Sequence, residues 1–158
     1  GNAHIVSNGD QTDTIAEYIG EGRTFEEALL TRCYEPDAPN FTPRISAVIY
    51  FNGQESNFAM SILKAMGNNP SEEKKEFYKY AKLAPGEGRC IHTYAGDGNP
   101  LPPFEGNPYI VTLGNDIDAT AKRYWGMLNP ENRVSLLVKY IDTSTGIDTI
   151  RIINRFID

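Results

Sequence analysis

Four polar residues near the amino end of the chain are spaced so that they converge on one turn. A short apolar run is followed by Ser7, Asn8, Thr12 and Asp13. Because Asn8-Gly9 readily adopts positive φ, we expect a sharp turn there, with Thr12 or Asp13 capping a helix. Free N–H groups and the helix dipole at such a turn favour an anion or a developing oxyanion. The simpler alternative is a capped helix after a tight turn, and this stretch alone favours it.

A proline-stiffened loop over residues 34–43 supplies a second set of polar groups. Loops of this kind present their side chains at fixed positions. Tyr34, Glu35 and Asp37 either line a pocket or cap local structure. Arg44 follows the loop, and its planar guanidinium can hold a phosphate or a carbonyl. The alternative for Arg44 is a surface ion pair with Glu35 or Asp37.

His92 and Tyr94 form a third candidate set, on a predicted strand over residues 89–94. Alternation would place both side chains on one face, where they can point into a cleft. Tyr94 can donate a hydrogen bond to an oxyanion, or it can be a buried tyrosine bonded to a backbone carbonyl. Histidine suits proton transfer near neutral pH, although a lone histidine is more often structural. Cys90 would share this face, and we assign it to packing because nothing in the sequence lowers its pKa.

Composition limits the classes of protein that these residues can serve. The chain has 158 residues and a net charge of −6, which suits one globular domain and argues against a general nucleic-acid binder. A small anionic ligand remains allowed, because a few local cations are enough. We find no bilayer-spanning run, no secretion signal and no Cys or His spacing typical of disulfides or zinc. We therefore expect a cytoplasmic protein with reduced thiols and without metal or membrane partners.

Three amphipathic segments are predicted to be helices. The first follows the Ser-Asn-Gly turn and ends near Gly20 and Gly22, which suit a left-handed cap. The second opens with a capping box formed by Thr24 and Glu27. The third is capped by Asn115 and carries an apolar stripe.

Alternating apolar residues predict strands over residues 44–51, 57–63, 89–94, 133–141 and 147–156. Asn52-Gly53 is predicted to join the first two as a hairpin turn. The segment 71–83 fits a helix or a strand, and we favour a strand from Glu76 onward. The Gly- and Pro-rich loop over residues 96–106 is expected to cover or shape a site. Together these elements describe an α+β domain in which helices cover antiparallel sheets.

Several of these stretches resemble the archaeal-type IMP cyclohydrolase family when they are taken in order. They are Ser7-Asn8-Gly9-x-x-Thr12-Asp13, Tyr34-Glu35-x-Asp37 and Thr42-Pro43-Arg44-Ile45, together with Cys90-Ile91-His92-Thr93-Tyr94 and Phe104-Glu105-Gly106, which resemble the bacterial branch. The resemblance implies an Ntn-hydrolase-like αββα sandwich of largely antiparallel sheets. It also implies the last step of purine synthesis, in which the formylated aminoimidazole carboxamide ribotide (FAICAR) closes to IMP with loss of water and without a cofactor.

The chain departs from the family in one respect. The family has strands and functional residues upstream of the Ser-Asn-Gly turn, so we expect the single domain over residues 1–158 to be incomplete at its amino end. Gly1 also does not supply the N-terminal nucleophile of true Ntn hydrolases. The fold resemblance therefore does not imply amidase chemistry.

Ring closure requires a proton acceptor for the carboxamide nitrogen and a donor for the formyl oxygen. On the resemblance, Asp13, Tyr94 and His92 are the catalytic candidates, with Asp13 also explained as a helix cap. The substrate-binding candidates are Ser7, Asn8, Thr12, Tyr34, Glu35 and Arg44. The expected partner is a nucleotide substrate, and a homo-oligomer is left open. Two alternatives remain: a hydrolase or cyclase acting on another amide or nucleotide, and a non-catalytic purine-nucleotide-binding protein.

Overall fold

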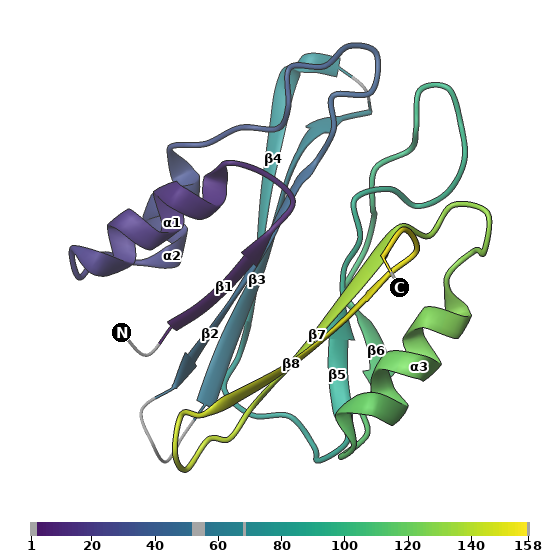
Figure 1. The fold of residues 1–158 in the computed structure, drawn as a ribbon. Helices are drawn as coiled ribbons and strands as arrows, with labels where there is room; N and C mark the ends of the chain where they lie inside the picture. The colour runs from purple at the N-terminus through teal and green to yellow at the C-terminus, as the bar shows by residue number, and fades with distance from the viewer. Residues whose placement is uncertain (1–2, 52–55, 68, 158) are drawn as a thin grey trace.

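The computed structural model describes residues 3–51, 56–67 and 69–157, which form a mixed α+β fold with antiparallel sheets (Figure 1). The main sheet has the order β1-β2-β3-β4, with bounds Ala3–Ser7, Arg44–Phe51, Ser56–Met66 and Asn69–Tyr80. Two ribbons pair β5 with β6 and β7 with β8, with bounds Glu87–Cys90, Tyr109–Thr112, Ser135–Ile141 and Asp148–Asn154. The helices α1, α2 and α3 span Gln11–Gly20, Phe25–Leu30 and Ile117–Met127.

One face of the main sheet carries the hydrophobic core. The register aligns Ile5 with Val48 and Val48 with Ala59, so their side chains share a face. On this face Val48, Ala59 and Leu63 pack against the buried side chains of Ile15, Phe25, Ala28 and Leu29 from α1 and α2. Burial of this face attaches both helices to the sheet and positions the start of α1 beside the start of β2.

The opposite face of the main sheet is turned toward the two ribbons. Figure 1 shows α1 and α2 on one side of β1–β4, the ribbons on the other side, and α3 beyond the ribbons. The hydroxyls of Thr120 in α3 and Tyr140 in β7 lie 2.7 Å apart and help to hold α3 on its ribbon. Between the sheets, Val6 and Leu137 remain 65% and 58% exposed. The core on this side is therefore less completely closed than the core under α1 and α2.

Several predicted elements are confirmed. β2 has the predicted bounds, and its return strand β3 extends the predicted range at both ends. The capping box is formed by reciprocal bonds: Glu27 N donates to Thr24 Oγ1 at 3.1 Å, and Thr24 N donates to Glu27 Oε2 at 2.8 Å. Gly22 has φ of 78°, as a left-handed cap requires. The predicted turn at Asn52-Gly53 lies outside the described residues.

Other predicted boundaries are wrong. The N-cap of α1 is Asp10, whose side chain makes no capping bond, so neither Thr12 nor Asp13 caps this helix. Asp116, and not Asn115, caps α3 by accepting a bond from Ala119 N. β4 begins at Asn69, well before Glu76, because its charged residues pair along the length of β3. The last two strands begin at Ser135 and Asp148, slightly later than predicted.

Candidate functional site

Asn8 joins three segments that are far apart in the sequence. Its Nδ2 donates to the carbonyl of Pro43 at 2.9 Å and to Thr93 Oγ1 at 3.3 Å. Its Oδ1 accepts from Ile45 N at 3.0 Å and from Gln11 Nε2 at 3.1 Å. Both amide hydrogens of Asn8 are therefore engaged, and a bond to a substrate oxygen would need one of them to be released. In this conformation Asn8 ties the turn to β2 and to the segment after β5.

The Ser-Asn-Gly turn is braced by its own hydroxyl groups. Ser7 Oγ and Thr12 Oγ1 each donate to the carbonyl of Gly9 at 3.0 Å, and the two hydroxyls also contact each other. Gly9 is not among the described residues with positive φ, so our reason for a glycine there was wrong. A Cβ at Gly9 would instead lie 2.8 Å from Arg44 Nη1 and from Gln11 Oε1. The turn needs glycine because buried side chains approach its backbone closely.

The start of α1 does not leave all its backbone donors free. Thr12 N and Asp13 N donate to the carbonyls of Gly9 and Asp10, both at 3.3 Å. Asp13 is exposed in the first turn, where its charge favours the helix dipole. These bonds weaken the predicted anion site at this terminus.

Arg44 lies on the helix face of the main sheet, at the level of its pairing partner Leu63. It is only 8% exposed, and its Nη1 contacts Gln11 Oε1 at 2.7 Å, Glu35 at 3.0 Å and the carboxylate of Asp10. The predicted pair with Glu35 therefore forms, but in a buried setting. Asp10 also binds Arg32, and the bonds from Arg32 and then from Arg44 lower the pKa of Asp10.

Asp37 binds Thr42. The backbone N–H of Thr42 donates to Asp37 Oδ1 at 2.6 Å, and Thr42 Oγ1 lies 2.5 Å from Asp37 Oδ2. Thr42 Oγ1 also lies 2.6 Å from the hydroxyl of Tyr94. Desolvation acts to raise the pKa of Asp37, but the side-chain and backbone bonds from Thr42 outweigh it and lower that pKa. Tyr34, on the same loop, packs edge-on against Phe41 with ring centroids 5.8 Å apart.

His92 and Tyr94 do not lie on a strand, because β5 ends at Cys90. The predicted alternation therefore fails, and the two side chains have different surroundings. His92 packs against the rings of Phe104 and Tyr109, at centroid distances of 4.7 and 5.5 Å, while its Nδ1 lies 2.5 Å from the carbonyl oxygen of Tyr94.

Burial raises the pKa of the Cys90 thiol, which agrees with the prediction that Cys90 is a packing residue.

A groove of about 330 Å³ lies beside the Ser-Asn-Gly turn, on the face of the main sheet opposite α1 and α2. Its wall is mainly apolar, and the lining residues are Val6, Ser7, Asn8, Ile45, Ser46, Ala47, Met60, Arg89, Cys90 and Ile91. This volume is at the lower end of the range for small-molecule sites. Of the nine predicted site residues, Ser7 and Asn8 line the groove. The other seven do not: Thr12, Asp13, Tyr34, Glu35, Arg44, His92 and Tyr94.

Arg89 is the charged residue in the lining of this groove, and the sequence analysis missed it. Its guanidinium lies 3.6 Å from Glu87 and 5.4 Å from the centre of the Tyr80 ring. A larger cavity of about 530 Å³ lies near Phe51, Tyr124 and Leu137 and contains none of the predicted residues. We therefore place the candidate site at the smaller groove, which the Ser-Asn-Gly turn borders.

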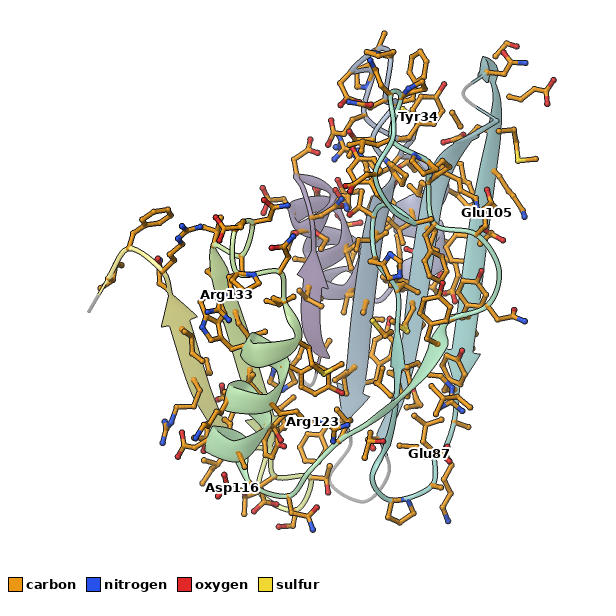
Figure 2. The ribbon with its side chains drawn as sticks, turned by 90° about the vertical axis from the view of Figure 1, so that its right-hand side faces the viewer. Tyr34, Glu87, Glu105, Asp116, Arg123 and Arg133 are labelled. Carbon is orange, nitrogen blue, oxygen red and sulfur yellow. The ribbon has the colours of Figure 1, made fainter. Side chains whose placement is uncertain are left out.

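Lys64 is a second residue that the sequence analysis missed. It is fully buried, and its Nζ lies 2.6 Å from the carbonyl oxygen of Phe104, 2.8 Å from Glu105 and 3.1 Å from Glu76. Figure 2 shows Glu105 beside the main sheet, away from Asp116 near α3. The signal was a lysine inside an apolar strand, because a buried ammonium group requires anionic partners.

A family model described as IMP cyclohydrolase-like protein matches residues 1–145. The chain belongs to the IMP cyclohydrolase-like family. The resemblance drawn from the motifs is thereby confirmed, and the matched region contains every residue of the candidate site. No solved structure matches the chain.

Two further observations bear on this IMP cyclohydrolase-like chain. In residues 3–51, 56–67 and 69–157, no group of three or more His, Cys, Asp or Glu side chains is arranged to hold a metal ion. Over the same ranges, no helix is both long and apolar enough to cross a membrane.

Proposed function

We propose that the protein is an IMP cyclohydrolase, which closes FAICAR to IMP with loss of water. One observation carries the proposal: three stretches with the family resemblance meet at Asn8, through its bonds to Pro43 and Thr93. The groove of about 330 Å³ borders this junction. Family membership supports a cyclohydrolase-related activity. We also propose an Ntn-hydrolase-like αββα fold, supported by the order of helices, sheet, ribbons and helix in Figure 1.

The groove suits the chemistry of a purine ribotide. Ile45, Ala47 and Met60 supply an apolar wall for the flat heterocycle. Arg89 is the proposed cation for the phosphate, because a guanidinium binds phosphate oxygens in fork geometry. Its guanidinium contacts the Gly88 carbonyl, Glu87 and the Tyr80 ring, so phosphate binding requires the side chain to turn into the groove. Ser7 and Asn8 border the same space and are the proposed polar contacts at its end.

The enzyme has a modest chemical task in this reaction. The attacking carboxamide and the formyl group are neighbours on one ring, so the substrate itself has removed most of the positional entropy. The protein must select the reactive rotamer, accept a proton from the nitrogen and stabilise the charge on the formyl oxygen. On the family resemblance we keep Asp13, His92 and Tyr94 as proposed proton-transfer groups and Thr12, Tyr34, Glu35 and Arg44 as proposed binding residues, although none of these seven side chains lines the groove.

The test is direct conversion of substrate. Folded protein is incubated with FAICAR, and the formation of IMP is followed by absorbance. The aminoimidazole carboxamide ribotide without its formyl group serves as the control, because it cannot close. We expect IMP from FAICAR and none from the control. No conversion by folded full-length protein would remove the assignment.

A second candidate function is purine-nucleotide binding without catalysis. It is favoured by the fact that Asn8 and Arg44 direct their polar groups to other protein groups. Such a protein would show a thermal shift with IMP and no turnover of FAICAR. Stabilisation by other nucleotides alone would indicate a hydrolase or cyclase acting on a different substrate.

A further inference from the structure

Arg89 is the charged side chain among the described residues that line the groove, yet its guanidinium contacts three residues that do not line it. Its Nη1 donates to the carbonyl of Gly88 at 2.9 Å and lies 3.6 Å from Glu87 Oε2. Its Cζ lies 5.4 Å from the centre of the Tyr80 ring. The cation that the groove needs for a phosphate is therefore bound to protein groups beside it.

These three contacts are weak. A separation of 3.6 Å between Arg89 and Glu87 makes an ion pair without a hydrogen bond. The distance of 5.4 Å to the Tyr80 ring is close to the outer limit of cation–π attraction, about 6 Å. The Gly88 carbonyl is a neutral acceptor. A phosphate offers the same guanidinium two parallel charge-assisted bonds, each roughly twice as strong as a neutral one, so it can displace these partners.

The groove is within reach of the Arg89 side chain. Tyr80 pairs with Phe58 across β3 and β4, and the two rings stack with centroids 4.8 Å apart. Met60, which lines the groove, follows Phe58 by two residues on β3, so both side chains lie on the same face of the main sheet. Two residues along a strand span roughly 7 Å. Rotation of the long arginine side chain covers this distance while β5 stays in place.

We propose that Arg89 has two positions, and that Glu87 and the Tyr80 ring hold it in a resting position until the phosphate of the ribotide draws it into the groove; this inference rests on the proposed function. Glu87 and the phosphate compete for one guanidinium. The apparent dissociation constant of a phosphate ligand is then its intrinsic value divided by the fraction of Arg89 that is free of Glu87. Glu87 is a positioning residue, which acts through Arg89 and does not touch the substrate. By weakening the hold on the phosphate, it favours release of the product.

The first test is E87Q, which removes the charge and keeps the size of the side chain. IMP should bind about two- to fivefold more tightly to this variant, the range expected for loss of a partly exposed ion pair. Inosine, which has no phosphate, should bind as it does to the wild-type protein. KM for FAICAR should fall by a similar factor while kcat does not rise, because the phosphate contact is the same in the ground state and the transition state.

Asp118 provides a matched control. It also pairs with an arginine, Arg151, and neither of these residues lines the groove. D118N removes one negative charge and releases one guanidinium, as E87Q does. It should leave the affinity for IMP unchanged, and tightening equal to that in E87Q would assign the effect to net charge and overturn the inference.

A double-variant cycle separates the resting contact from direct repulsion between Glu87 and the phosphate. In the R89M background, E87Q should leave the affinity for IMP unchanged, because no guanidinium is there to be released. Equal tightening in the wild-type and R89M backgrounds, or no tightening in either, would overturn the two-position arginine.

A spectroscopic measurement tests the movement without turnover. In ¹⁵N-labelled protein, the Nε–H resonance of Arg89 is assigned by its absence in R89M. IMP should shift this resonance and inosine should not, and a resonance that saturating IMP leaves in place would overturn the inference. Protein that shows this shift and the E87Q effect but converts no FAICAR would lose the proposed catalysis and keep the two-position arginine. Protein that converts FAICAR with an unchanged KM in E87Q would keep the function and lose the inference.

Discussion

The ammonium group of Lys64, fully buried in β3, lies 2.6 Å from the carbonyl oxygen of Phe104. Two carboxylates, those of Glu76 and Glu105, complete its surroundings at 3.1 and 2.8 Å. Phe104 N in turn donates to the carbonyl of Thr93 at 3.2 Å. Lys64 therefore fastens the segment after β5 to the main sheet, and through Thr93 it supports the junction at Asn8.

Replacement of Lys64 by Met should loosen this segment without unfolding the protein. Met suits the apolar strand, Glu76 keeps Lys74 at 2.9 Å, and the exposed Glu105 can turn to solvent. We expect a loss of about 1–3 kcal/mol in unfolding free energy, because the Phe104 carbonyl loses its partner. Backbone amide hydrogen exchange over residues 91–106 should be faster in K64M than in the wild-type protein. K74M is the control, since Lys74 binds Glu76 alone of these groups, and equal exchange in both variants would contradict the fastening role.

Substitution of Gly9 by Ala should destabilise the turn. The new Cβ would lie 2.8 Å from Arg44 Nη1 and 3.2 Å from Glu35 Oε1, and Arg44 is buried. We expect a loss of about 1–3 kcal/mol, the usual cost of overpacking. G20A is the matched control, because nothing lies within 4 Å of a Cβ there. It should be stabilising by about 0.5–1 kcal/mol at its helical position. Urea unfolding measures the unfolding free energy of both variants. An unchanged unfolding free energy in G9A would show that the side chains of Arg44 and Glu35 can move away from the new Cβ.

Glu76 should make stability depend on pH in the acid range. Burial acts to raise its pKa, but the bonds from Lys74 and Lys64 outweigh this and lower the pKa below 4.5. A lowered pKa in the folded state stabilises the protein above pH 4.5, and this contribution is lost as pH falls through the folded value. E76Q should therefore flatten the fall of the urea midpoint between about pH 5 and pH 3. E72Q changes an exposed residue on the same strand and should leave the pH dependence of the urea midpoint as in the wild-type protein. An unchanged pH dependence in E76Q would show that Glu76 is not the group responsible.

Arg89 should govern recognition of the phosphate group. R89M should weaken binding of IMP by roughly ten- to a hundredfold, as expected for loss of a charged hydrogen bond, and leave inosine binding nearly unchanged. Arg23 is a matched control, because it also lies over a tyrosine ring, at 3.9 Å, and beside a carboxylate, at 3.8 Å. Calorimetric titration of both nucleotides into R89M and R23M makes the comparison. Parallel losses for IMP and inosine in R89M would show that Arg89 supports the groove only structurally.

The elements that local signals specify were predicted well. The alternation of β2 and the capping box at Thr24 depend on neighbouring residues, and both are present. The extent of β4 depends on pairing with β3, and the end of β5 at Cys90 depends on the contacts of the segment that follows. Such boundaries are decided by tertiary contacts, so alternation within one segment could not supply them.

The sequence indicated which segments lie together better than it indicated which residues line the groove. The motifs indicated that the Ser-Asn-Gly turn, the start of β2 and the segment near Tyr94 come together, and hydrogen bonds do join these segments. Arg44 and Tyr94 nevertheless do not line the groove that Asn8 borders. Which hydrogen bonds each polar group makes depends on residues 30 to 85 positions away, as with Asn8 and Thr93. The role of Gly9 was also misread, because its constraint comes from Arg44 across the fold and not from its own φ.

The most direct measurement compares FAICAR turnover by the wild-type protein with turnover by a variant whose groove is filled. Ala47 lines the groove on β2, so A47W places a large ring in the proposed substrate space, and circular dichroism reports whether the variant folds. The account predicts that the wild-type protein forms IMP and that folded A47W does not. IMP formation at equal rates by both proteins, or by neither, would contradict it.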